Sequence, residues 1–82
     1  MVTVTLYTRA RCHLCHDAHD VLLGVQRERP FSLDVVDVDT DPALVERYGL
    51  EVPVVEVDGR KAFKYRVDPA ALRDRLSRAE AP

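Results

Sequence analysis

The first third of the chain passes from one hydrophobic period to another. In VTVTLYT, β-branched and aromatic residues alternate and place Val2, Val4 and Leu6 on one face, which predicts a β-strand. The next apolar residues follow the helical spacing i, i+4, i+7, i+8, i+11: Leu14, Ala18, Val21, Leu22 and Val25. This spacing predicts an amphipathic helix that ends before Pro30, because a proline inside a helix removes a backbone hydrogen bond.

The rest of the chain predicts three more strands and two more helices. The segments FSLDVVDVD, PVVEV and RKAFKYR have strand composition, and Asp58–Gly59 is a hairpin turn signal between the last two. Asp41–Pro42 and Asp68–Pro69 each match an N-cap residue followed by proline at the first helical position. The first of these helices should end at Gly49. The buried stripe of the second is expected at Leu72, Leu76 and Ala79.

The predicted order of elements is β-α-β-α-β-β-α. A strand, a helix and a second strand imply a parallel pair joined by a right-handed crossover, and a closing hairpin adds antiparallel strands. We therefore expect an α/β fold in which a four-stranded mixed sheet is flanked by three helices. With 82 residues, the chain should form a single domain over residues 1–82.

Composition and charge argue against several classes of function. The 46% hydrophobic and 32% charged residues are typical of a globular protein, and the net charge of −2 argues against a general nucleic-acid binder. No apolar run approaches the ~20 residues that span a membrane, and the first residues do not resemble a signal peptide. We expect a cytoplasmic monomer that binds neither nucleic acid nor membrane. In the reducing cytosol, a close cysteine pair favours catalysis or metal binding over a permanent cross-link.

Both cysteines, Cys12 and Cys15, lie where the first strand turns into the first helix. Residues three apart on a helical turn have Cβ atoms ~5–6 Å apart, close enough for a disulfide to form and break. Cys12 should be the more acidic thiol, because it lies at the helix N-terminus among cationic neighbours. Those neighbours are Arg9, Arg11, His13 and His16. Cys15 should be more buried and less acidic.

The same cysteines and histidines match two other patterns. CHLCH fits the c-type haem attachment motif, but Met1 is the only methionine and no export signal is visible. Cys12, Cys15, His16 and His19 share one helical face, which suggests zinc. Structural zinc sites usually take two ligand pairs from separate elements, and no second pair is present in the sequence. A non-enzymatic binding or adaptor domain whose Cys/His cluster holds metal is kept as the alternative.

The strand, CxxC, helix and later Val-Pro before a β-hairpin resemble the thioredoxin superfamily from about Thr3 to Leu76. The short length, the segment LYTRARCHLC and the lack of tryptophan resemble glutaredoxins, in particular the small bacterial glutaredoxin-like proteins. This resemblance implies that Cys12 is the attacking cysteine and Cys15 the resolving one. It also implies that Pro53 is a cis-proline and that the backbone of Val52 docks a substrate strand.

The sequence departs from the glutaredoxin pattern at several positions. His13-Leu14 replaces the Pro-Tyr of dithiol glutaredoxins, and Arg9 or Arg11 stands where a lysine precedes the first cysteine. The Gly-Gly pair before the last helix is absent from KYRVDPAAL, whereas the aspartate that holds glutathione is matched by Asp68. Asp68 is equally explained as a helix cap.

These observations predict a cytosolic thiol–disulfide oxidoreductase without a bound cofactor. Its substrates would be protein disulfides or glutathione mixed disulfides, and its reductant glutathione or a thioredoxin-reductase-like flavoprotein. The residues expected to contact substrate are Arg9, Arg11, His13, Leu14, Val52, Pro53 and Asp68.

Overall fold

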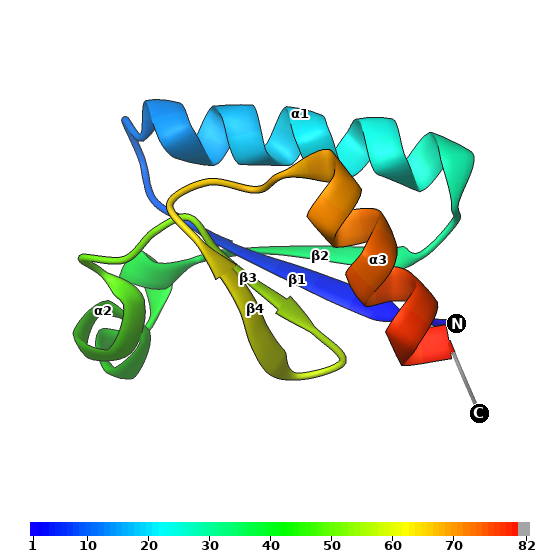
Figure 1. The fold of residues 1–82 in the computed structure, drawn as a ribbon. Coiled ribbons are helices and arrows are strands. Elements are labelled where there is room, and N and C mark those ends of the chain that lie inside the picture. The colour runs from blue at the N-terminus through cyan, green and yellow to red at the C-terminus, as the bar shows by residue number, and fades with distance from the viewer. Residues whose placement is uncertain (81–82) are drawn as a thin grey trace.

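The computed structural model describes residues 1–80 and has a four-stranded sheet in the order β2-β1-β3-β4 (Figure 1). The central strand β1 (Thr3–Thr8) pairs in parallel with β2 (Ser32–Asp37) and antiparallel with β3 (Val54–Val57). An antiparallel pair of β3 and β4 (Arg60–Lys64) completes the sheet. The predicted β-α-β-α-β-β-α order and the mixed sheet are therefore confirmed.

Alternating side chains of the sheet supply two separate cores. Val4, Leu6 and Val55 point to the face that is covered by α1 (His13–Glu28) and α3 (Pro69–Glu80), where Leu22 and Leu72 are fully buried. Tyr7 and Val54 lie one position along their strands and so face the other side, with α2 (Pro42–Tyr48). Figure 1 shows α1 and α3 on one side of the sheet and α2 on the other.

Helix α1 has the boundaries that its sequence pattern predicts. Its N-cap is Cys12, and its last backbone hydrogen bond runs from Arg29 N to Val25 O just before Pro30. Its buried residues are Cys15, Ala18, Leu22 and Val25, which confirms the predicted stripe; Leu14 and Val21 are half-buried.

The turn and capping signals are also found at the predicted places. Asp41 Oδ1 accepts from Ala43 N at 2.9 Å, and Asp68 Oδ2 accepts from Ala71 N at 2.9 Å. Asp58 and Gly59 have φ values of 50° and 80°, as the two central residues of a tight hairpin turn require. Helix α2 ends at Tyr48, with Gly49 as its C-cap.

Three details of the prediction are wrong. Ala79 is exposed, so the buried stripe of α3 consists of Leu72 and Leu76. Strand β2 stops at Asp37 because the Asp37 carboxylate caps a short 3₁₀ helix, η1 (Val38–Thr40). Strand β4 stops at Lys64, and Tyr65 follows with a positive φ of 67° that cannot continue a strand.

Within residues 1–80, no helix is both long and apolar enough to cross a bilayer.

Candidate functional site

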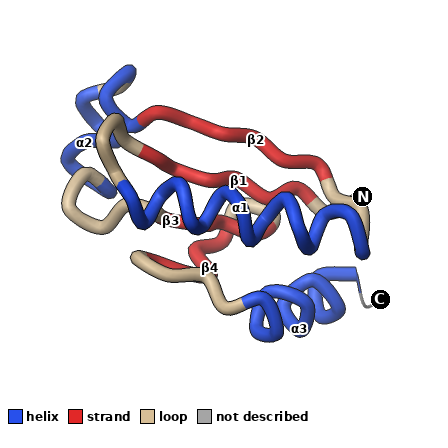
Figure 2. Tube along the Cα trace, turned by 90° about the horizontal axis from the view of Figure 1, so that it is seen from above, coloured by secondary structure: helices blue, strands red, loops and turns tan. Residues whose placement is uncertain are grey.

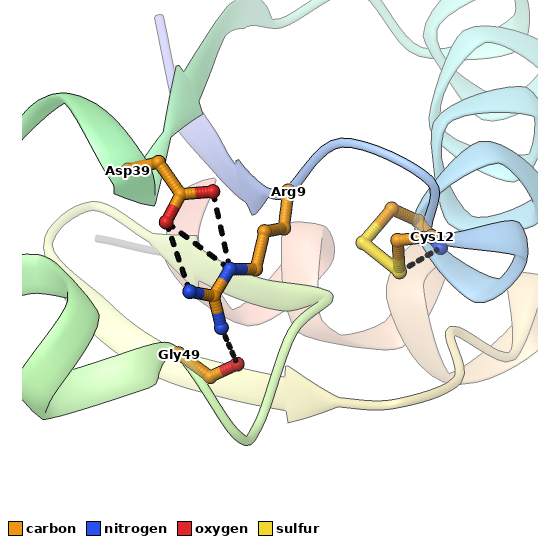
Figure 3. The surroundings of a disulfide bond; sticks show 5 residues. Arg9, Cys12, Asp39 and Gly49 are labelled. Atoms are coloured by element: carbon orange, nitrogen blue, oxygen red, sulfur yellow. Dashed lines mark hydrogen bonds and ion pairs between the residues drawn. A yellow bond between two sulfur atoms is a disulfide. The ribbon is translucent and has the colours of Figure 1, made fainter.

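Cys12 and Cys15 lie at the end of β1, where the chain turns into α1. The structure joins them as a disulfide, with their Cα atoms 5.2 Å apart (Figure 3). The connection is short because Arg11, immediately before Cys12, adopts the left-handed conformation with φ of 61°. This turn directs the chain from the strand into the first turn of the helix, which brings residues three apart within reach of each other.

The two sulfur-bearing residues have different surroundings. Cys15 is 3% exposed and belongs to the buried face of α1, whereas Cys12 is half-exposed at the N-cap. The Sγ atom of Cys12 also accepts a hydrogen bond from the backbone N–H of Cys15 at 3.1 Å. The site therefore pairs one accessible sulfur that receives a backbone donor with one sheltered sulfur.

The two arginines before Cys12 have different positions. The Arg9 guanidinium forms hydrogen bonds from Nε and Nη2 to Asp39 and from Nη1 to Gly49 O at 3.0 Å. Figure 3 shows it directed toward these two residues and away from the disulfide. The hydrogen bond and the charge of Asp39 raise the pKa of Arg9. Arg11 is exposed, and no ion pair to it is found within residues 1–80.

The residues between and beside the cysteines line two depressions. One contains Arg9, Arg11, His13 and both cysteines, together with histidines of α1. The second lies between α1 and the segment before α3, where Leu14 and Asp68 meet Tyr65. Asp68 caps α3, as its sequence context predicted. Of the expected contact residues, Arg9, Arg11 and His13 thus lie on one side of α1, and Leu14 and Asp68 lie on the other.

Pro53 immediately precedes β3, and its peptide bond with Val52 is cis. The pairing of Tyr7 with Val54 places Val52 and Pro53 at the end of β1 from which the cysteine loop departs. Pro53 is buried and Val52 half-buried. Neither lines the two depressions described above.

Sequence reasoning missed a buried carboxylate on the side of the sheet that α2 covers. Glu56 is 7% exposed in β3 and accepts hydrogen bonds from Tyr48 Oη at 2.6 Å and from Tyr7 Oη at 3.1 Å. Burial, and then the hydrogen bond with Glu56, raise the pKa of Tyr48 to about 12 and also raise that of Tyr7. The signal in the sequence was a charged residue inside the apolar run VVEV.

The metal alternative required Cys12, Cys15, His16 and His19 to converge. The structure instead joins the two sulfurs to each other. Among residues 1–80, no three histidine, cysteine or acidic side chains are grouped as ligands for one metal ion.

Comparisons with known proteins agree with this geometry. The family model described as Glutaredoxin-like domain (DUF836) matches residues 3–77. The uncharacterized protein Rv0508 of Mycobacterium tuberculosis is 33% identical over 81 residues, covering 93% of this chain and 84% of that protein. A glutaredoxin-like protein of Dictyostelium discoideum is 26% identical over 77 residues, covering 87% of this chain and 71% of that protein.

Solved structures show the same fold. A structural genomics target from X. campestris has a TM-score of 0.76 and 38% identity, covering 96% of this chain and 99% of that one. A thioredoxin mutant from Halobacterium salinarum has a TM-score of 0.74 at 22% identity, covering 99% of this chain and 76% of that one. The second likeness concerns the fold alone, and together they confirm the expected thioredoxin-like architecture.

Proposed function

Since the chain belongs to the glutaredoxin-like (DUF836) family, we propose that it is a thiol–disulfide oxidoreductase whose working groups are Cys12 and Cys15. The observation that carries this proposal is the disulfide itself, in which an accessible sulfur is bonded to a buried one at a helix N-terminus. A dithiol exchanger needs this division, because one sulfur must meet the substrate while the other waits beside it.

The reaction starts from the reduced dithiol. The Cys12 thiolate attacks one sulfur of a substrate disulfide, forms a mixed disulfide and releases the other substrate sulfur as a thiolate. Cys15 loses its proton and attacks Cys12 Sγ, which releases the second substrate thiolate and forms the Cys12–Cys15 disulfide. Two electrons pass to the substrate, and an external dithiol or two glutathione molecules restore the reduced pair.

Two features support Cys12 as the attacking residue. Its Sγ receives the Cys15 N–H at 3.1 Å, and a donor in this position would stabilise the thiolate of the reduced protein. The N-terminus of α1 adds a partial positive charge at the same place. Attack by Cys15 on an external disulfide is disfavoured, because its side chain is buried against the sheet.

The substrate contacts extend the proposal. The backbone of Val52 would pair with an extended segment of a protein disulfide or with glutathione, next to Pro53 and Leu14. Asp68 keeps one carboxylate oxygen outside its capping bond and lies in the depression that contains Leu14. We place this reaction in the cytosol, where a reductant such as glutathione or a flavoprotein is available.

Single cysteine substitutions test the two roles. Cys12→Ser should abolish disulfide reduction, because the attacking sulfur is gone. Cys15→Ser should keep the attack but accumulate a mixed disulfide with the substrate, which mass spectrometry of the non-reduced protein detects. Reduction of a model disulfide peptide by Cys12→Ser at the wild-type rate would contradict the assignment of roles. Loss of trapping in Cys15→Ser would contradict the dithiol mechanism.

A further inference from the structure

Tyr65, in the loop between β4 and α3, has a backbone conformation that is unfavourable for its side chain. Its φ is 67°, and a hydrogen bond from Arg66 N to Lys64 O at 2.8 Å closes a three-residue turn around it. Such γ-turns with a positive φ at the central residue are rare and strained, and a bulky side chain adds to the strain. Strain of this kind persists where the surrounding structure holds it, and it clusters at functional sites.

The contacts that hold Tyr65 lead to the segment before β3. Tyr65 N donates a hydrogen bond to Pro53 O at 2.8 Å. Lys64 Nζ lies 5.5 Å from the centroid of the Tyr65 ring and 3.9 Å from Glu51 Oε2. Figure 2 shows the loop between β4 and α3 at the end of the sheet where α1 begins and where the chain enters β3. Tyr65 is therefore fixed beside Val52 and Pro53, the segment proposed to dock the substrate.

The Tyr65 side chain borders the depression between α1 and this loop, which has a volume of about 350 Å³. Leu14, which lies between the two cysteines in the sequence, lines the same depression together with Val21 and Val67. Tyr65 is 43% exposed, so its ring can contact a bound molecule. A segment that is bonded to Cys12 and pairs with the backbone before β3 would pass this ring.

The charges of this depression favour a neutral occupant. The charged residues that line it are Asp17, Asp68 and Arg66, two acidic and one basic. They provide no excess of positive charge for glutathione, whose net charge is negative, and like charges brought together disfavour binding. The remaining lining is largely apolar, which suits a neutral apolar side chain.

We propose that Tyr65 contacts the substrate and selects protein disulfides in which an apolar residue flanks the reactive cysteine. In the mixed disulfide with Cys12, this flanking side chain would lie between Leu14 and the Tyr65 ring, while the backbone of the segment pairs with Val52. Removal of an apolar side chain from water against an aromatic ring favours binding. The inference rests on the proposed function and names the substrate class that the same site prefers.

The test compares two symmetric disulfides, each formed by two copies of a short peptide with a single cysteine. The cysteine is flanked by leucine in one peptide and by serine in the other. Rapid quenching and mass spectrometry give the rate constant at which each disulfide oxidises the reduced protein. Each value is divided by the rate constant of the same disulfide with dithiothreitol, which corrects for the intrinsic reactivity of its sulfurs. We expect the leucine disulfide to react about tenfold faster than the serine disulfide and also faster than glutathione disulfide.

Substitutions at Tyr65 separate the ring from the backbone conformation. Tyr65→Asn and Tyr65→Gly tolerate a positive φ but lack the ring, and each should lower the preference for leucine to about twofold or less. Tyr65→Phe retains the ring and should retain the preference. Val35→Ala is the matched control, because Val35 is 49% exposed in the depression on the other side of α1. It should keep the preference of the wild type.

Urea unfolding distinguishes this role from a structural one. Tyr65→Asn and Tyr65→Gly should be at least as stable as the wild type, since residues that tolerate a positive φ replace a strained tyrosine. Lower stability with an unchanged preference for leucine would overturn the proposal, because Tyr65 would then only support the fold.

The three disulfides also separate this inference from the proposed function. Equal corrected rate constants for the leucine and serine disulfides, or a faster reaction with glutathione disulfide than with the leucine disulfide, would overturn the assignment of Tyr65. In either case the proposed function would stand, because a disulfide is still reduced. A wild-type protein that reduces none of the three would contradict the proposed function itself, and the inference would fail with it.

Discussion

At the scale of single residues, Glu56 is a buried carboxylate that is held by two tyrosine hydroxyl groups. It lies in β3 between buried valines, and its two carboxylate oxygens each accept a hydrogen bond from a tyrosine. A buried carboxylate without such donors would be strongly destabilising. The tyrosine rings are also in contact, with their centroids 4.9 Å apart, so Tyr7, Tyr48 and Glu56 stabilise the face of the sheet that α2 covers.

Removal of one donor should be measurable in stability. Tyr48→Phe should lower the free energy of unfolding by about 1–3 kcal/mol, because a hydrogen bond to a buried charged group is lost. Urea unfolding at neutral pH measures this difference. The exposed Tyr65 provides the matched control, and Tyr65→Phe should change the free energy of unfolding by less than about 0.5 kcal/mol. Equal effects of the two substitutions would show that the hydrogen bond from Tyr48 to Glu56 does not contribute to the free energy of unfolding.

The same substitution should change how the free energy of unfolding depends on pH in the alkaline range. The pKa of Tyr48 is about 12 in the folded protein, compared with about 10 for an ordinary tyrosine in an unfolded chain. Folding therefore favours the protonated phenol, and this stabilisation is complete below about pH 10 and is lost as the pH rises toward 12. The wild-type protein should lose more stability than Tyr48→Phe between about pH 9 and 11. Parallel pH profiles for the two proteins would contradict this assignment.

Arg9 and Arg11 show what residue type alone does not determine. Both precede Cys12 and both were expected to contact substrate. In the structure, the Arg9 guanidinium contacts the carboxylate of Asp39 and the carbonyl of Gly49, whereas Arg11 is exposed in the depression beside the cysteines. The distinction depends on which residues α2 and η1 bring beneath the loop, a long-range contact that leaves no local signal in the sequence.

At the scale of secondary-structure elements, boundaries with a local physical cause were predictable. The aspartate–proline pairs begin α2 and α3, and Asp58–Gly59 makes the hairpin turn, because each requires only its own side chain and backbone conformation. The exposure of β2 was not predictable. Its apolar residues are compatible with a central or an edge strand, and the difference depends on where α1 lies over the sheet.

Gly49 ends α2 as predicted, but it does not use the left-handed conformation that glycine adopts easily. Its φ of −55° is accessible to any residue. The actual requirement is space, because an added Cβ would overlap the carbonyl oxygen of Val45 and would lie 3.3 Å from Arg9 Nη1. The close approach of Gly49 to the Val45 carbonyl of α2 thus accounts for this glycine, and the Arg9 side chain narrows the space further.

Two glycine substitutions distinguish a steric effect on stability from an effect of helix propensity. Gly49→Ala should lower the free energy of unfolding by about 1–3 kcal/mol, since the backbone of α2 or Arg9 must move. Gly24→Ala in α1 meets no atom within 4 Å and should raise it by about 0.5–1 kcal/mol, because alanine favours the helix. Chemical denaturation of both variants gives the comparison. A Gly49→Ala protein as stable as the wild type would show that the contact with Val45 relaxes at little cost.

At the scale of the whole molecule, the residues that stabilise the fold are separate from the cysteines that we propose carry out the chemistry. One face has the main core under α1 and α3, the other has the tyrosine–glutamate cluster, and the cysteines lie at the end of β1. The cysteine pair could be identified from sequence because its spacing and its position before an amphipathic helix are local. The depression that the three histidines line beside the cysteines could not be identified, because it requires the register of β1 with β2 and the edge position of β2.

Because the cores are separate from the Cys/His cluster, we can predict whether folding requires a metal. Both cores consist of apolar and aromatic side chains that do not involve His13, His16 or His19, so folding should not require a metal. The free energy of unfolding should be the same with and without a chelator. Under both conditions, titration in glutathione buffers should give one two-electron transition of Cys12 and Cys15 between about −200 and −280 mV.

The same titration distinguishes the oxidoreductase from the metal-binding alternative. A structural zinc would be stoichiometric, its removal would unfold the chain, and metal-bound thiolates would resist disulfide formation until the chelator is added. A transition that appears only after chelation would therefore support the adaptor domain. A transition that is unaffected by chelation, in a chain that stays folded, is expected for a dithiol whose two sulfurs bond reversibly to each other.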